Sequence, residues 1–189
     1  MPGTAKTFEE YAHQVFIPYV EEQQRRTSRL DLIWDSYKDG SLKTSTREKR
    51  GNRVRRRVVN TAAIPGNWQS FLSVDANKVK VFSFLSNVLV QTFNDDPKEL
   101  VVTDGEAVIC LPRQKDESSL APCCQEEADT RIILHVAHAA VHDHRQIQVR
   151  TVDTDVVALA VMVAQALPCM DELWIAFGDG QELPLHPCS

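Results

Sequence analysis

The sequence has none of the long apolar segments that membrane spans and secretory leaders require. No run of about 18 apolar residues occurs, and the opening MPGTAKTFEEYA has no basic start followed by an apolar stretch. The five cysteines are an odd number and include no C-x2-C pair, which argues against a disulfide framework in a chain of 189 residues. With 43% hydrophobic and 25% charged residues, the chain can bury one ordinary core. We therefore expect an intracellular globular protein with reduced thiols and no membrane partner.

Dense positive charge is confined to one short segment. Residues 43–57 contain eight basic residues and one acid and carry +7, while the whole chain carries −5, so the remaining residues carry −12. The basic residues of this segment are Lys43, Arg47, Lys49, Arg50, Arg53, Arg55, Arg56 and Arg57. Such a concentration is typical of a surface that meets a polyanion or of a nuclear import signal, with a solvated charged face as the alternative. The segment predicts a nucleic-acid partner, DNA or RNA, and favours the nucleus over the cytoplasm.

Apolar residues recur with helical or strand-like spacing along most of the chain. Helical spacing covers residues 8–25, 68–89, 126–141 and 156–167, and apolar runs of strand length cover 29–35, 100–103, 107–111, 147–152 and 173–177. Pro18 predicts a bend or an early end of the first helix, and Asp104-Gly105 predicts a tight turn. The alternation predicts an α/β fold with a mainly parallel central sheet and helices on both faces, in a single domain spanning 1–189. We expect a surface helix or mobile arch over about residues 38–66.

Acidic residues stand at the ends of predicted strands and at the start of a predicted helix. Asp35 and the pair Asp153 and Asp155 follow apolar strands, and Glu127 and Asp129 open the helix between them. Ligands of open α/β sheets lie beyond the carboxyl ends of the strands, so these positions indicate a site. Converging carboxylates repel one another unless a cation offsets their charge, and oxygen ligands suit Mg²⁺ or Mn²⁺. Acids at such positions are also common as helix caps and solvated ends, which is the alternative interpretation.

Two acidic blocks resemble the internal motifs of flap endonucleases and related PIN-like nucleases. The blocks are Glu127-Ala128-Asp129 before an apolar helix and Asp153-Thr154-Asp155 after a strand, and their order and approximate spacing match that family. Trp34-Asp35 followed by the basic segment is similar to the family's strand-terminal aspartate and basic arch. The resemblance covers about residues 30–177. Four shorter segments resemble a group of multi-copy animal proteins with no settled function; they are WDSYKDGSLK, REKRG, IPGNW and EEADTRIILH.

The resemblance implies a PIN-like, metal-dependent nuclease domain that acts on nucleic-acid phosphodiesters with Mg²⁺ or Mn²⁺, two ions in a complete domain. It implies metal ligation by Glu127, Asp129, Asp153 and Asp155, catalytic roles for Asp35, Lys43 and Arg50, and nucleic-acid contacts by Arg47, Lys49, Arg53, Arg55, Arg56 and Arg57. The family also carries an aspartate on an earlier strand and a Gly-Cys-Asp-type motif after the last strand matched here. Neither is present in this sequence, so we expect an incomplete domain. The alternative is a non-catalytic nucleic-acid-binding or interaction module derived from a nuclease fold.

A zinc site is a further alternative. His135, His138 and His142 recur at helical spacing after the pair Cys123-Cys124. Helical histidines are more often ordinary surface residues, and no second cysteine pair supports a zinc motif. All three tryptophans lie in apolar runs, which favours core packing over stacking on nucleobases.

Overall fold

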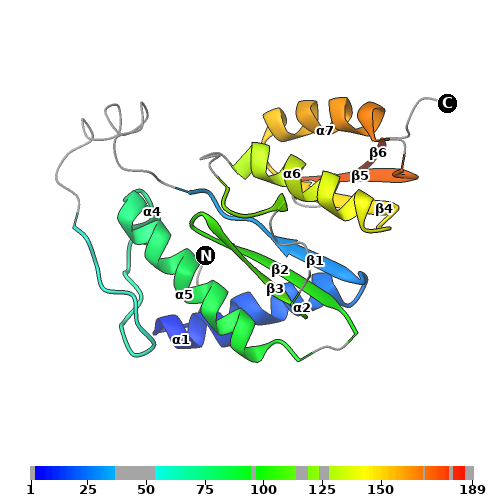
Figure 1. Ribbon diagram of the computed structural model, residues 1–189. Coiled ribbons are helices and arrows are strands. Elements are labelled where there is room, and N and C mark those ends of the chain that lie inside the picture. Colours follow the sequence, from blue (N-terminus) through cyan, green and yellow to red (C-terminus); the bar gives the residue numbers. More distant parts are fainter. Residues whose placement is uncertain are drawn as a thin grey trace. The chain divides into compact units, whose positions relative to one another are not determined.

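The computed structural model divides the chain into two compact units, Met1–Glu117 and Ser118–Ser189 (Figure 1). It describes residues 3–36, 54–94, 97–113, 119–123, 128–167 and 169–178, and the backbone of 181–185. Each unit has its own apolar core, and the predicted single domain over 1–189 stays a prediction. Among the described helices, none combines the length and the apolar character needed to cross a bilayer.

The first unit opens with a helical stretch that changes its pitch near Pro18. Its elements are α1 (Phe8–Tyr11), the π-helix η1 (Ala12–Phe16) and α2 (Ile17–Gln24). The Ile17 N–H donates to the Ala12 carbonyl, five residues back, which gives the wider π-turn. Pro18 has no N–H to donate and its ring crowds the preceding turn of a regular helix. The interruption predicted at Pro18 therefore takes the form of a π-turn directly before it.

A three-stranded sheet follows these helices in the first unit. Its strands are β1 (Arg29–Leu32), β2 (Glu99–Asp104) and β3 (Ala107–Leu111). They lie in the order β1-β2-β3, with β1 parallel to β2 and β2 antiparallel to β3. Gly105 begins the two-residue connection between β2 and β3 with a φ of +60°, which suits glycine at the first central position of a type II′ turn. The strands predicted over 100–103 and 107–111 and the turn after Asp104 are confirmed, whereas the strand predicted over 29–35 ends at Leu32, three residues before Asp35, and is only partly buried.

Two further helices contribute to the first core, one of which packs on this sheet. They are α4 (Trp68–Leu72) and α5 (Asp75–Thr92), which correspond to the helical spacing predicted over 68–89. The Asn67 side chain caps α4 by accepting a hydrogen bond from the Ser70 N–H at 2.9 Å. Phe8 lies at the centre of the core, and its ring contacts those of Trp68, Phe71 and Phe84. This aromatic group joins α1, α4 and α5 into one packed layer.

The described residues of the second unit form two helices and a second small sheet. Its elements are α6 (Ala128–Val141), β4 (Gln146–Thr151), α7 (Thr154–Ala166), β5 (Glu172–Phe177) and β6 (Gln181–Leu185). β4 is parallel to β5, and β5 is antiparallel to β6. Val149 and Ile175 are paired across β4 and β5 and therefore face the same side of the sheet, where Val136 of α6 and Ala160 of α7 pack on them. The strand β6 was not predicted, and Pro184 within it suits an edge position.

The mixed α/β class predicted from the sequence is confirmed. Each sheet combines one parallel pair with one antiparallel edge strand, and the helices α6 and α7 share one core with the strands of the second sheet. A single, mainly parallel PIN-like sheet that unites both units, with helices on both of its faces, stays a prediction. The described part of the expected arch, residues 54–66, forms an irregular segment, and the rest of it lies outside the described residues.

Candidate metal centre

Asp153 and Asp155 are fixed at the junction of β4 and α7. Asp153 is the N-cap of α7, and its carboxylate accepts a hydrogen bond from the Asp155 N–H at 2.9 Å. The Thr151 hydroxyl in turn accepts a hydrogen bond from the Asp153 N–H at 3.0 Å. Both aspartates are solvent-exposed. The turn therefore presents two carboxylates to solvent from a backbone that side-chain hydrogen bonds hold in place.

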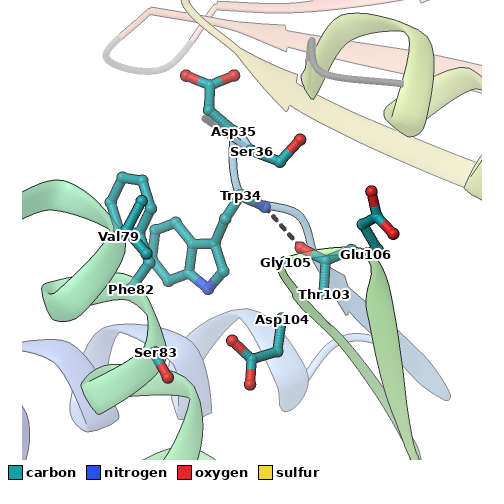
Figure 2. A pocket seen from close by; sticks show the side chains of 10 residues that line it. All are labelled: Trp34, Asp35, Ser36, Val79, Phe82, Ser83, Thr103, Asp104, Gly105 and Glu106. Carbon is teal, nitrogen blue, oxygen red and sulfur yellow. Dashed lines mark hydrogen bonds between the residues drawn. The ribbon is translucent and has the colours of Figure 1, made fainter. Parts of the chain in front are cut away.

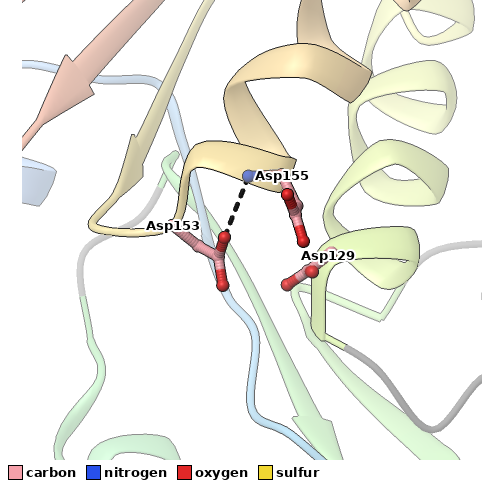
Figure 3. A group of neighbouring side chains, drawn as sticks. All are labelled: Asp129, Asp153 and Asp155. Carbon is pink, nitrogen blue, oxygen red and sulfur yellow. Dashed lines mark hydrogen bonds between the residues drawn. The ribbon is translucent and has the colours of Figure 1, made fainter.

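Asp129 supplies a third carboxylate to the same place. It lies in the first turn of α6, and one carboxylate oxygen from each of Asp129, Asp153 and Asp155 lies within 4.8 Å of the other two. Figure 3 shows the side chains of Asp129 and Asp155 pointing toward each other, with the Asp153 carboxylate beside them. Three of the four predicted metal ligands are thus brought together in one unit. The fourth, Glu127, lies outside the described residues.

The electrostatics of this cluster favour a cation. Three carboxylates at such separations repel one another, and the positive N-terminal ends of α6 and α7 offset part of this repulsion. A divalent ion would offset the remaining charge, and an all-oxygen ligand set suits Mg²⁺ or Mn²⁺ better than softer metals. The donor set and its spacing therefore fit a hard divalent ion.

Asp35 lies in the first unit and lines a pocket of about 140 Å³ there (Figure 2). Asp104 and Glu106, on either side of the hairpin glycine, line the same pocket. Because β1 and β2 are parallel, their carboxyl ends meet at one edge of the sheet, which places Asp35 and Asp104 at the same pocket, with their carboxylates pointing in different directions (Figure 2). We did not predict Asp104 and Glu106 as neighbours of Asp35, although a predicted turn at the end of a strand was a usable signal. The convergence of Asp35 with the acids of the second unit stays a prediction.

The backbone next to Asp35 is held by the tryptophan that precedes it. The Trp34 N–H donates to the Thr103 hydroxyl at 2.8 Å, and the indole N–H donates to the Ser86 hydroxyl at 2.8 Å. The indole also stacks on Phe82, with ring centroids 4.4 Å apart and planes at 7°. Trp34 packs against the first core, as predicted, and so does Trp68. Trp34 is thus fixed at three points, and the exposed Asp35 follows it directly in the chain.

The predicted basic residues are described only in part. Arg55, Arg56 and Arg57 are exposed on the first unit. The other predicted phosphate contacts lie outside the described residues; they are Lys43, Arg47, Lys49, Arg50 and Arg53. Their roles in catalysis or binding stay predictions.

The histidines considered for a zinc site do not form one in the described part of the chain. The rings of His138 and His142 stack with centroids 4.0 Å apart, and His142 Nδ1 lies 2.8 Å from the His138 carbonyl oxygen in a hydrogen bond. Within the described residues, the groups of three or more metal-ligating side chains that could share an ion include no histidine and no cysteine. The three-aspartate cluster is therefore the better-supported metal site.

The capping role of Asp153 predicts a measurable loss of stability. Asp153→Ala should lower the free energy of unfolding by about 1 kcal/mol, because the Asp155 N–H at the start of α7 loses its side-chain acceptor. Asp153→Asn keeps an acceptor and should lose only a small part of this. Hydrogen exchange of the α7 amides over a urea series in EDTA measures the free energy of unfolding of the second unit in both variants. Equal losses in the two variants would contradict the capping role.

Comparisons with known proteins add no relative. No protein-family model, curated protein or solved structure matches the chain. The likeness to flap endonucleases therefore rests on the acidic motifs and stays a prediction. The function must be argued from the carboxylate cluster and from the charges around it.

Proposed function

We propose that this chain is a nuclease-like domain in which Asp129, Asp153 and Asp155 hold Mg²⁺ or Mn²⁺ against a nucleic-acid phosphodiester. The observation that carries the proposal is the approach of three carboxylates from the starts of two different helices to within 4.8 Å. The motif order that resembles flap endonucleases supports it independently, because the sequence alone selected these same three residues. The proposed fold is the PIN-like sheet of that family, and the proposed setting is the nucleus.

A bound divalent ion would supply Lewis acidity and a water of lowered pKa at the phosphorus. The chain's own residues would position that ion. Asp153 would contribute one carboxylate oxygen while its hydrogen bond to the Asp155 N–H fixes the turn. Because Asp153 and Asp155 are exposed, the cluster is accessible to a long polymer. Within the same proposal, Glu127 completes the ligand set for a second ion, Asp35 orients the site, and Lys43 and Arg50 contact the scissile phosphate.

A non-catalytic nucleic-acid-binding module is the second candidate. The observation that favours it is the run of exposed arginines Arg55, Arg56 and Arg57, which needs no metal to attract phosphate. Under this alternative, the aspartates act as helix caps and solvated ends. Cation binding separates the two candidates.

Cation binding is tested with Mn²⁺, whose free concentration is read from its paramagnetic resonance spectrum. The wild-type protein should bind Mn²⁺, and Asp129→Asn combined with Asp155→Asn should weaken binding by at least about 100-fold, because two of three charged ligands lose their charge. The matched control removes the same charge from exposed acids elsewhere in the second unit, with Asp143→Asn and Asp171→Asn. Equal Mn²⁺ affinity in the wild type and the cluster variant would exclude the proposed metal centre.

A further inference from the structure

A buried amide side chain holds the backbone of the exposed arginine segment. Asn77 lies on α5 and is fully buried. Its Oδ1 accepts a hydrogen bond from the Arg56 N–H at 2.9 Å, and its Nδ2 donates to the Val54 carbonyl at 3.2 Å. Nδ2 also donates to the Phe71 carbonyl, at 3.1 Å. The Asn77 amide thus bonds the chain on both sides of Arg55, in the two-point pattern that a neighbouring β-strand would use.

The same segment is attached again further along the chain. Val58 packs against the first core. The Asn60 carbonyl accepts a hydrogen bond from the Glu9 N–H at 3.2 Å, and the Ala62 carbonyl accepts one from the Phe8 N–H, also at 3.2 Å. The backbone from residue 54 to residue 62 is therefore fixed to α1 and α5, while the side chains of residues 55–57 remain exposed.

This arrangement differs from an ordinary solvated charged surface. Burying an asparagine side chain costs free energy unless its polar atoms form hydrogen bonds. Asn77 is fully buried, and two of its three described hydrogen bonds go to the backbone of the exposed basic segment. Three adjacent guanidinium groups on a fixed backbone lose less conformational freedom on binding than the same groups on a free chain. Guanidinium groups also match the bidentate geometry of phosphate oxygens.

We propose that Asn77 is a positioning residue that holds Arg55, Arg56 and Arg57 as a preformed contact surface for the phosphate backbone of a nucleic acid. That the ligand is a nucleic acid rests on the proposed function, whereas the positioning of the three arginines rests on the hydrogen bonds of Asn77. Three exposed guanidinium groups on one anchored segment suit the closely spaced phosphates of a nucleic-acid backbone. Binding to this surface requires no divalent ion, so it is separable from the carboxylate cluster.

The experiment measures binding of a fluorescently labelled oligothymidine in EDTA over a series of salt concentrations. Arg55→Gln with Arg56→Gln should reduce the slope of log affinity against log salt by about 1.4, since each phosphate contact on a single strand contributes about 0.7. Asn77→Leu should reduce the slope by about 0.7 although it changes no charge, because the arginines lose their fixed placement. Hydrogen exchange should show a protected Arg56 amide in the wild type and a faster one in Asn77→Leu.

The matched control is Arg25→Gln with Arg26→Gln, which removes the same charge from exposed arginines of the same unit that pair with Glu22. This control should keep the wild-type slope. The proposal is wrong if both arginine pairs change the slope equally, if a folded Asn77→Leu keeps the wild-type slope, or if the wild-type Arg56 amide is unprotected. If Asn77→Leu does not fold, the proposal is tested by the salt slopes of the two double arginine variants and by hydrogen exchange of the Arg56 amide in the wild type. Tighter binding to phosphatidylserine vesicles than to the oligonucleotide would assign the surface to a membrane instead.

A failure of this inference is distinguishable from a failure of the proposed function. Loss of cation binding or cleavage leaves the salt slope in EDTA untouched. Conversely, if the salt slope is the same in Asn77→Leu and in the wild type, the three aspartates remain candidates for catalysis.

Discussion

Replacing Asp153 and Asp155 together with asparagine should lower Mn²⁺-dependent cleavage of a single-stranded or flap oligonucleotide by at least about 100-fold. The two residues contribute two of the three carboxylates that lie within 4.8 Å of one another. Loss of outer-shell partners of a metal ligand already costs about 10- to 100-fold, so the loss of two direct ligands should exceed that range. Asparagine at position 153 keeps a side-chain acceptor for the start of α7, so the fold should survive.

The control for this experiment removes the same charge elsewhere in the second unit. Asp143→Asn with Asp171→Asn should cleave at the wild-type rate, because both residues are exposed and stand outside the cluster. Cleavage that persists in the Asp153 and Asp155 variant, or that ignores EDTA, would point to a contaminating nuclease. A wild-type protein that binds the oligonucleotide and cuts nothing with Mg²⁺ or Mn²⁺ would leave the non-catalytic module as the function.

The carboxylate cluster could be predicted because its geometry follows from local rules. Asp153 and Asp155 come directly after an apolar strand, and the carboxyl end of a parallel strand is where α/β folds place ligands. Acids at positions i and i+2 of a helix interior lie about 200° apart, so Glu127 and Asp129 could both reach one site only from the entry turn of the helix, and Asp129 does lie in the first turn of α6. The helices, the strands β2 to β5 and the turn at Gly105 likewise follow from periodicity and from backbone preferences.

The features that sequence reasoning missed depend on contacts between distant residues. Asn77 and Arg56 are 21 positions apart, and a polar residue on a helix gives no sign that it will be buried against another segment. Asp104 and Glu106 become neighbours of Asp35 only through the pairing of β1 with β2. The strand β6 contains a proline and too few apolar residues to show a strand period. Tertiary pairing, which local pattern does not encode, supplied each of these features.

Phe8→Ala should lower the free energy of unfolding of the first unit by about 3–5 kcal/mol. Phe8 is 1% exposed, and its ring contacts Trp68, Phe71 and Phe84 at centroid distances of 5.8–6.3 Å, so its removal leaves a cavity at the meeting point of α1, α4 and α5. Domains are stable by only about 5–15 kcal/mol, so the loss is a large part of the total. Tyr19→Ala, at a side chain that is 55% exposed, should change stability by no more than about 0.5 kcal/mol.

Hydrogen exchange of the Phe8→Ala variant also tests how many domains the chain contains. The residues of the first core all precede position 118, and those of the second core all follow it, so each unit buries its own apolar surface. Faster exchange should therefore be concentrated in β1, β2 and α5, while β4, β5 and α7 keep their protection. If protection falls equally in both units, they unfold as one cooperative domain, and the single domain predicted over 1–189 holds. That outcome would require the interaction between the units to contribute about as much free energy to stability as either apolar core does.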